Sequence, residues 1–361
     1  MPISAELVAV VMAGGSGTRF WPLSRRRRPK QLLPFAGGRS LLSAAVERLL
    51  PLVPASRVLV VTGAGIADEV RADLPALPAD NVLAEPAGRD TAACIGWVAW
   101  RLLASAPDAV MLVVPADHAI PDGAALRRAL AAAAEVAARR DALVTLGLAP
   151  TGPEPGFGYL ELDPQSEVAG ELVAHPVRRF VEKPGRERAA ELLASGDWRW
   201  NSGMFAWRVR TIVAAVREHL PALASALDRL VEDAASMGEA AALAAHYPGL
   251  PRTSIDFGVM EKAREVWAVP VRFAWSDVGS WPGLAAVLPE HPAGTVLGDV
   301  VALDCERSVL VSEGPLLAAV GLRDVVVVAT ADAVLVLPRA EAQRVREVVD
   351  RLEARGRTDV L

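Results

Sequence analysis

A run of small residues follows the first apolar stretch of the chain and has the composition of a phosphate-binding loop. Residues 7–12 are expected to form a buried strand, and after them come Ala13-Gly14-Gly15-Ser16-Gly17-Thr18-Arg19 and, further on, Lys30. Glycines after a strand let backbone N–H groups approach a phosphate chain without obstruction from a Cβ atom. The Gly-Lys-Ser/Thr ending of a Walker A loop is missing, and the dinucleotide fingerprint has no Arg and Lys at this spacing. The glycines alone could form a structural turn, but with Arg19 and Lys30 they predict phosphate binding.

Lysine is rare in this chain, which holds 38 Lys and Arg residues but only three lysines, Lys30, Lys183 and Lys262. Each of the three lies in a compact polar motif. A lysine ammonium binds phosphate as a compact point charge, whereas Arg presents a planar fork of donors. We therefore expect Lys30 and Lys183 to mark phosphate contacts, although composition alone leaves chance placement open. Lys262 could support the site through an ion pair or only cover its surface.

Alternating apolar and amphipathic segments must position these residues. The expected strands are 7–12, 58–62, 81–84, 110–114 and 142–146, and the expected helices are 41–50, 66–73, 91–104 and 124–140. This alternation indicates crossover units and a mainly parallel sheet of the α/β class. Ligands of such sheets bind outside the carboxyl ends of the strands, where the glycine run stands.

The pattern changes after Pro150. Expected strands at 158–162 and 177–181 and helices at 186–194 and 211–227 predict an elaboration of the same sheet. A Pro/Gly/His break at 289–294 precedes short strands over 296–337 and a last helix over 340–354. We therefore predict a large α/β domain over residues 1–290 and a small β domain with a terminal helix over residues 291–361. The Arg25–Arg28 run is typical of a solvated face.

Composition narrows the functional classes. The net charge of −5 argues against a general nucleic-acid binder, which needs a basic surface. Cys94 and Cys305 lack metal-binding spacing, so we expect two buried, reduced thiols. No secretory signal or run of roughly 18 apolar residues is present, which predicts a cytoplasmic protein without a membrane partner.

Further motifs follow the glycine run in order, at residues 20–31, 85–92, 115–118, 180–184, 200–205, 254–262 and 275–281. Together they resemble the sugar nucleotidyltransferases, and more closely the mannose-1-phosphate guanylyltransferase branch. The resemblance implies a Rossmann-like nucleotide-diphospho-sugar transferase fold with a mixed, mainly parallel sheet, and a β-helix-like C-terminal domain. The chain ends without the cupin-type domain of longer bifunctional relatives, so no isomerase activity is expected.

The resemblance also implies a triphosphate site. The nucleotide would lie against four loop residues, Gly14, Gly15, Gly17 and Thr18. Arg19 would stabilise the leaving pyrophosphate, and Lys30 would reach toward the α-phosphate and the incoming sugar phosphate. Asp117, directly after the strand at 110–114, and the distant Asp277 would hold Mg²⁺ through hard oxygen ligands. For either aspartate alone, a turn or cap role is the alternative.

A second group is implied for the sugar 1-phosphate. Lys183 would hold its phosphate and Glu182 would accept hydrogen bonds from sugar hydroxyls, unless the two form only an exposed ion pair worth under ~1 kcal/mol. Asn201 offers both donors and acceptors to a sugar ring. Gly158 and Asp256 complete the group. Asp256 would contact the sugar or support the metal site, although a helix N-cap explains it nearly as well. Some neighbouring residues are expected in structural roles, namely His118 and at least two of Trp198, Trp200 and Trp207.

The turn that contains Glu85 and Gly88 is expected to recognise the base. Guanine presents adjacent N–H donors, which a carboxylate or backbone carbonyls would complement. Glu85 could therefore read the base, or it could shape the turn whose backbone near Gly88 reads it. Asp90 stands where the family is expected to have Asn, which keeps a capping residue but adds a negative charge.

The implied reaction transfers GMP from GTP to α-D-mannose 1-phosphate, with Mg²⁺ as cofactor and GDP-mannose and pyrophosphate as products. The substrate supplies the nucleophile, so catalysis consists mainly of positioning and charge stabilisation. Two alternatives remain, another sugar-1-phosphate nucleotidyltransferase, such as a heptose 1-phosphate guanylyltransferase, and a non-catalytic regulatory homologue that binds sugar nucleotide. A homodimer that binds no nucleic acid is expected.

Overall fold

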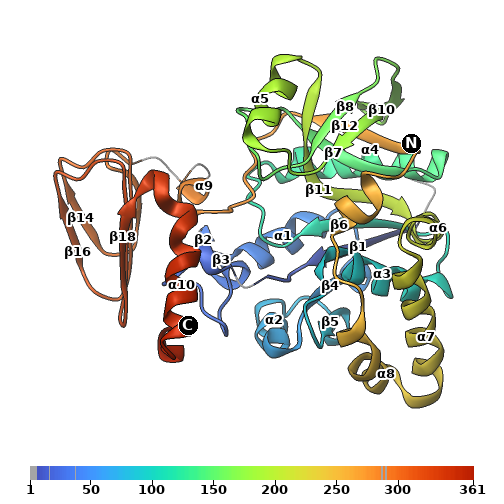
Figure 1. The fold of residues 1–361 in the computed structure, drawn as a ribbon, viewed down its shortest axis with the longest axis horizontal. Helices are drawn as coiled ribbons and strands as arrows, with labels where there is room; N and C mark the ends of the chain where they lie inside the picture. The colour runs from blue at the N-terminus through green and yellow to red at the C-terminus, as the bar shows by residue number, and fades with distance from the viewer. Residues whose placement is uncertain (1–5, 16, 37, 286–287, 289–290) are drawn as a thin grey trace. The chain divides into compact units, whose positions relative to one another are not determined.

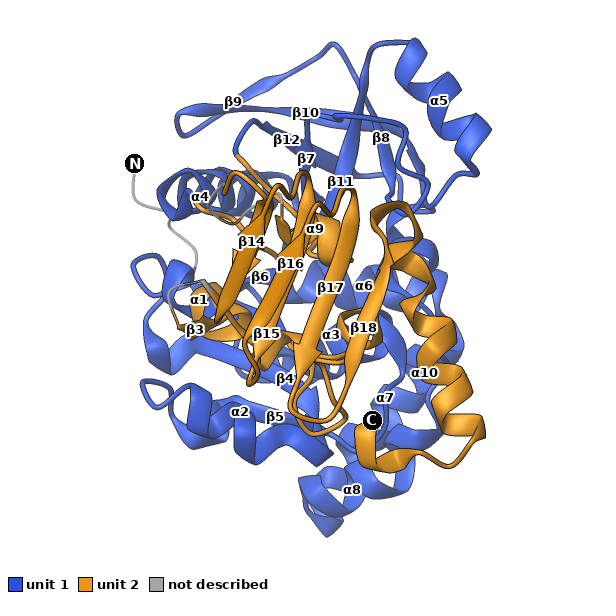
Figure 2. Ribbon diagram, turned by 90° about the vertical axis from the view of Figure 1, so that its left-hand side faces the viewer, with its two compact units in different colours: residues 1–12, 46–115, 122–273 blue, residues 13–45, 116–121, 274–361 orange. Residues whose placement is uncertain are grey.

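A computed structural model describes residues 6–15, 17–36, 38–285, 288 and 291–361. The chain divides into two compact units, which Figure 2 colours separately. Unit 1 comprises residues 1–12, 46–115 and 122–273, and unit 2 comprises residues 13–45, 116–121 and 274–361. The predicted boundary between residues 290 and 291 adjoins Pro289 and Glu290, which lie outside the described residues, as does Ser16 of the glycine run. This boundary stays a prediction.

Unit 1 is built on one ten-stranded mixed sheet, in the order β5-β4-β1-β6-β11-β7-β12-β10-β8, with β9 paired to β10. Its strands are β1 (Leu7–Met12), β4 (Val58–Gly63), β5 (Val82–Glu85), β6 (Val110–Pro115), β7 (Leu143–Leu148), β8 (Tyr159–Leu162), β9 (Glu167–Ala169), β10 (Leu172–Val181), β11 (Trp198–Arg208) and β12 (Val266–Val271). The first four strands in this order pair in parallel, whereas β11 runs antiparallel to β6, β7 and β8. The predicted α/β class and the elaboration of the same sheet are confirmed.

Parallel pairing of β1 with β6 matches Met12 with Pro115. The segments that begin at Ala13 and at Ala116 therefore leave the sheet at the same edge. The glycine run and Asp117 thus both follow the carboxyl ends of parallel strands, which is where such sheets bind ligands.

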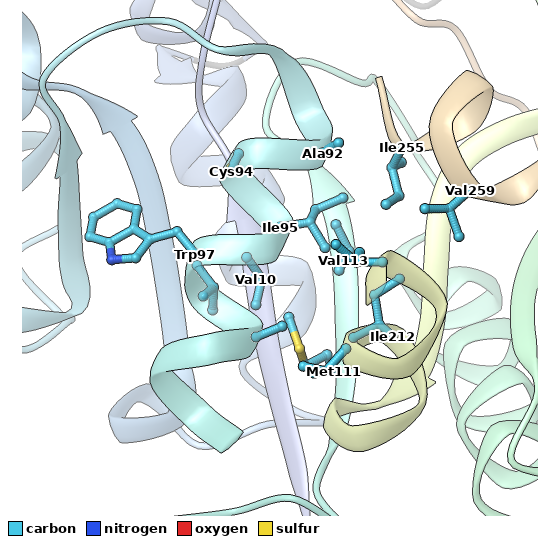
Figure 3. Close-up of a cluster of buried hydrophobic side chains, with 14 of the residues drawn as sticks. Val10, Ala92, Cys94, Ile95, Trp97, Met111, Val113, Ile212, Ile255 and Val259 are labelled. Atoms are coloured by element: carbon cyan, nitrogen blue, oxygen red, sulfur yellow. The ribbon is translucent and has the colours of Figure 1, made fainter. Parts of the chain in front are cut away.

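Helices α2 (Ala67–Asp73), α3 (Asp90–Leu103), α4 (Gly123–Arg140) and α6 (Val209–His219) pack on this sheet, while α7 (Pro221–Met237) and α8 (Glu239–His246) pack on neighbouring helices (Figure 1). Unit 1 also contains α5 (Arg186–Ala194), and α1 (Leu41–Leu49) spans the boundary of the units. Figure 3 shows Ile95 of α3, Val113 of β6 and Ile212 of α6 in one buried apolar cluster. Among the described residues, no helix is long and apolar enough to cross a membrane.

The prediction of one helix over residues 211–227 was wrong. Two helices, α6 and α7, meet at Leu220, whose φ of −132° is not helical. Pro221 starts α7 at its first turn. Proline has no N–H for an intrahelical hydrogen bond but suits a first turn, which explains the break.

Unit 2 contains the expected small β structure. Its elements are β2 (Pro34–Ala36), β3 (Arg39–Ser40), α9 (Trp281–Ala285), β13 (Gly294–Leu297), β14 (Val300–Leu303), β15 (Ser308–Glu313), β16 (Leu317–Val320), β17 (Val325–Thr330), β18 (Val334–Pro338) and α10 (Val345–Ala354). Strands β13, β15 and β17 form one parallel sheet that β18 joins antiparallel, and β14 pairs with β16. This alternation between two parallel sheets confirms the β-helix-like prediction.

Candidate active site

The predicted site residues fall into two groups, one in each unit. The glycine loop, Arg19, Lys30, Asp117 and Asp277 belong to unit 2. Those predicted to bind the base or the sugar phosphate belong to unit 1; they are Glu85, Gly88, Gly158, Glu182, Lys183, Asn201 and Asp256. Each group is a compact set of polar side chains with its own supporting contacts.

The glycine loop packs directly against Lys30. Gly15 and Gly17 have φ values of 95° and 59°, which L side chains rarely adopt. A Cβ on Gly17 would also meet the Lys30 backbone nitrogen at 2.9 Å and collide with its Cβ. Gly17 is therefore required by both its conformation and the close approach of Lys30.

A cavity of about 160 Å³ opens between this loop and Lys30. Its lining includes Gly14, Arg19, Asp117 and Gly279. A larger cavity of about 790 Å³ lies in unit 1 against β8, β10 and α4, and none of the predicted residues line it. The smaller, more polar cavity is thus the one that the sequence motifs surround.

Lys30 has a nearly buried side chain with three polar contacts. Its Nζ lies 2.7 Å from Asp117 Oδ2 and donates to the carbonyls of Asp277 at 3.1 Å and Val278 at 2.8 Å. Only 7% of the side chain is exposed. Because the burial leaves the ammonium little water, these oxygens fix it in place beside the glycine loop.

Asp117 and Asp277 are brought together by main-chain pairing. Ala119 and Ser276 form an antiparallel bridge with N–H···O distances of 2.9 and 3.1 Å. Burial opposes ionisation of Asp117, but the Lys30 ammonium and His118 outweigh it, so its pKa is lowered. Asp277 Oδ1 accepts the Gly279 N–H at 3.0 Å. The carboxylate of Asp117 is therefore held in its charged form within reach of Lys30.

These two carboxylates fit a magnesium ion. Mg²⁺ in proteins commonly uses one or two carboxylates together with substrate phosphates and water. Within the described ranges there is no cluster of three or more His, Cys, Asp and Glu side chains that could hold a metal by themselves. A metal at this site would therefore need oxygen ligands from the substrate as well as from Asp117 and Asp277.

Arg19 is exposed and donates from Nη1 to Gln343 Oε1 at 3.0 Å. The sequence suggested that the neighbouring Arg25–Arg28 run forms a solvated face, but the structure shows more than that. Arg25, Arg26 and Arg28 instead form ion pairs at 2.6–2.7 Å with acidic residues of the C-terminal segment. A charge run alone does not reveal partners about 300 residues away in the sequence.

The sugar-phosphate group gathers at the end of β10, in the first half of β11 and at the start of β8. Lys183 Nζ lies 3.0 Å from Glu182 Oε1, while Glu182 Oε2 is buried without a hydrogen-bond partner among the described residues. An added Cβ on Gly158 would collide with that same oxygen. The glycine thus leaves room beside an unsatisfied carboxylate oxygen, an arrangement that suits a hydroxyl donor.

Asn201 is held by its neighbours on both sides. Thr145 Oγ1 donates to Asn201 Oδ1, and Asn201 Nδ2 donates to Asp256 Oδ1, both at 2.8 Å. Asp256 begins a π-helical turn, Asp256–Met260, rather than capping a helix, and Ser254 Oγ accepts the Phe257 N–H at 3.2 Å instead. The capping alternative for Asp256 was therefore wrong.

Burial shifts the pKa of both carboxyls in this group. Burial, then the Asp256 charge, raises the pKa of Glu182 to about 7, although Lys183 opposes the shift. Burial also raises the pKa of Asp256, against the hydrogen bond from Asn201. Lys183 is half exposed, so its charge only partly offsets the burial of Glu182.

Glu85 ends β5 with its carboxyl buried. Tyr247 donates a short hydrogen bond to Glu85 Oε1. Burial raises the pKa of Glu85, and the hydrogen bond from Tyr247 opposes that shift. Gly88 lies exposed in the following turn. The Glu85 carboxyl thus has an internal partner, as the turn-shaping alternative requires.

The start of α3, just after this turn, contacts the segment that carries Asp256. Ile255 N–H donates to Thr91 Oγ1 at 2.8 Å, and Ala92 N–H donates to the Thr253 carbonyl at 3.2 Å. The base-reading candidates and the sugar-phosphate group therefore share one connected part of unit 1.

The remaining expectations concern buried tryptophans and cysteines, His118 and Lys262. Three tryptophans, Trp198, Trp200 and Trp207, are all buried, as are both free cysteines. His118 Nδ1 accepts the Trp275 Nε1–H at 3.2 Å, which agrees with a structural role. Lys262 is exposed and makes no ion pair with any described residue, so the suggested ion pair is absent from this part of the chain.

Sequence reasoning missed Gln343, Tyr247 and Thr145. Each contacts a predicted residue, respectively Arg19, Glu85 and Asn201. None of the three lies in a recognisable motif, and the hydrogen bonds join residues 324, 162 and 56 positions apart. The sequence carries no local signal from which they could have been found.

Comparisons with known proteins identify the family of this chain. Residues 8–292 match the Nucleotidyl transferase family model, and residues 298–352 match the MannoseP isomerase/GMP-like beta-helix domain. The chain is 39% identical over 359 residues to the xanthan biosynthesis protein XanB of Xanthomonas campestris, covering 98% of this chain and 75% of that protein. It is 38% identical over 366 residues to the mannose-1-phosphate guanylyltransferase ManC of Salmonella typhimurium, covering 98% and 74% of the two chains.

A solved structure supports the same relationship. A crystal structure described as mannose-1-phosphate geranyltransferase from Thermus thermophilus matches with a TM-score of 0.84 and 42% identity, over 96% of this chain and 99% of that one. The chain is therefore a nucleotidyltransferase, and it belongs to the branch of that family whose members carry the β-helix domain and include mannose-1-phosphate guanylyltransferases.

Proposed function

We propose that this enzyme transfers GMP from GTP to α-D-mannose 1-phosphate. A phosphate oxygen of the sugar phosphate attacks the α-phosphorus in line and forms a new P–O bond. The bond from the α-phosphorus to the bridging oxygen breaks, and pyrophosphate leaves with that electron pair. GDP-mannose is the other product, and no protein nucleophile is needed.

The observation that carries the proposal is the buried ammonium of Lys30 beside the glycine loop. Its contacts with Asp117 and two main-chain carbonyls hold a positive charge at the cavity that the loop surrounds. A preorganised charge stabilises developing negative charge on phosphate oxygens without further reorganisation. Arg19, at the same cavity, supplies a second cation for the leaving pyrophosphate.

Asp117 and Asp277 would hold the metal. When bound, Mg²⁺ neutralises charge on the triphosphate and orients its oxygens. The Lys30 ammonium keeps its ion pair with Asp117 Oδ2. Lys30 would therefore both support that carboxylate and face the phosphates.

On the sugar side, Lys183 would bind the phosphate and Glu182 Oε2 would accept a sugar hydroxyl. The unpaired, buried oxygen beside Gly158 supports this role, because a hydroxyl there would satisfy it. Asn201 and Asp256, which already hold each other, would contact the ring. The base would be read by the turn at Gly88, with Glu85 shaping that turn through its bond with Tyr247.

Pyrophosphate release tests the reaction directly. The enzyme is incubated with mannose 1-phosphate or glucose 1-phosphate and with GTP, UTP, dTTP or ATP in turn, with and without Mg²⁺. The proposal expects turnover with GTP and mannose 1-phosphate and loss of turnover without a divalent metal. Preference for another pair would point to a different sugar nucleotidyltransferase, and no turnover with any pair would refute the proposal. A cytoplasmic location and a homodimer stay predictions.

A further inference from the structure

The stretch of chain after the phosphate loop is fastened to the C-terminal segment of unit 2. Among the described residues, several polar side chains of residues 19–28 contact residues 313–360. The pairs are Arg19 with Gln343, Trp21 with Val360, Arg25 with Asp332, Arg26 with Glu353, and Arg28 with Glu313. Trp21 Nε1 donates to the Val360 carbonyl at 2.8 Å in a buried position, and Arg25 also donates to that carbonyl.

Apolar packing joins the same two parts. Phe20, Trp21 and Leu23 are buried in one cluster with side chains of β15, β17 and α10. The Arg25–Arg28 turn is itself closed by two main-chain hydrogen bonds of 2.9 and 3.0 Å. Residues 19–28, between the glycine loop and Lys30, therefore pack against the C-terminal segment.

The arginines of this stretch differ in whether their partner side chain is charged or neutral. Arg25, Arg26 and Arg28 meet carboxylates, which neutralise their charge. Arg19, which lines the phosphate cavity, meets the neutral amide oxygen of Gln343. An amide oxygen orients a guanidinium through a hydrogen bond but leaves its positive charge available to an anion.

We propose that the C-terminal segment positions the phosphate loop, with Gln343 as the positioning residue for Arg19. This role rests on the proposed nucleotide chemistry of the loop and deepens it. The β-helix domain and α10 act through residues 19–28, and the three carboxylates hold the turn while Gln343 aims the guanidinium at the cavity.

Removing the three carboxylates tests the fastening. The variant Glu313→Gln, Asp332→Asn, Glu353→Gln leaves Arg25, Arg26 and Arg27 in place as trypsin targets, whereas Pro29 protects the bond after Arg28. Its matched control is Glu306→Gln, Asp324→Asn, Glu347→Gln, which also loses three acidic residues of the segment, but ones paired with Arg307, Arg323 and Arg344. We expect tryptic cleavage within residues 25–28 to accelerate roughly fivefold or more in the first variant and to stay near wild type in the control.

Kinetics then separate positioning from general stability. The first variant should raise KM for GTP roughly three- to tenfold with little change in KM for mannose 1-phosphate, because exposed ion pairs are individually weak but act together here. Gln343→Ala should raise KM for GTP without accelerating cleavage, and Gln343→Glu should raise it further, since a carboxylate would compete with the triphosphate for Arg19.

The outcomes are distinguishable. Equal cleavage rates in the wild type and both triple variants would overturn the positioning role, whatever the activity. Equal KM values for GTP in wild type and both Gln343 variants would overturn the assignment of Gln343. A wild-type enzyme without turnover would instead refute the proposed function, and the cleavage comparison would still report on the fastening.

Discussion

Replacing Glu182 by Gln tests how burial controls this carboxyl. Its pKa is raised from 4.5 to about 7, first by burial and then by the nearby Asp256. Between these two values the native state keeps a proton that the unfolded chain has released. The free energy of unfolding of the wild type therefore falls as pH rises from about 4.5 to 7. At about 1.36 kcal/mol per pKa unit, the fall between pH 5 and pH 8 comes to about 2–3 kcal/mol.

Glutamine has nearly the same shape and cannot ionise. In urea unfolding at pH 5, 6, 7 and 8, the Glu182→Gln variant should thus gain about 2–3 kcal/mol in free energy of unfolding relative to wild type across the series. Glu187→Gln provides the matched control, because Glu187 is an exposed carboxyl on α5 of the same unit. It should follow the wild type at every pH.

A difference between wild type and the Glu182→Gln variant that stays constant from pH 5 to pH 8 would refute the reasoning. It would mean that Lys183, at 3.0 Å, compensates the buried carboxylate fully. If the Glu187→Gln control gained stability relative to wild type in the same way as the Glu182→Gln variant, the effect would not come from burial.

The remaining predictions concern the other polar contacts. Lys30→Ala should lower turnover by orders of magnitude while circular dichroism shows a folded chain, and near-normal pyrophosphate release would exclude its catalytic role. Gly158→Ala should raise KM for mannose 1-phosphate roughly tenfold, because the added methyl displaces Glu182 at a cost of about 1–3 kcal/mol; an unchanged KM would remove Glu182 from the sugar site. Tyr247→Phe should lower the free energy of unfolding by about 1–3 kcal/mol by leaving the buried Glu85 without its donor, and urea unfolding equal to wild type would show that water replaces the hydroxyl.

Local patterns predicted the parts of the fold that depend on neighbouring residues. The strand at Leu7–Met12 and the glycine loop were both found from sequence, because apolar runs and glycines report local backbone preferences. The break at Pro221 was missed, since the apolar periodicity continues across it. Long-range partners could not be predicted: nothing near Arg19 indicates Gln343, and nothing near Glu85 indicates Tyr247.

Unit 2 is assembled from three stretches of chain, 13–45, 116–121 and 274–361, and this has a consequence for the order of folding. Lys30 finds its carbonyl partners 247 and 248 residues later in the sequence. Contacts of such separation form late, because the entropy of closing the intervening loop opposes them until other structure has formed. During synthesis the parallel strands β1, β4, β5 and β6 can pair well before the phosphate loop is complete. A nascent chain would therefore gain the proposed triphosphate site only after residues 277 and 278 have emerged from the ribosome.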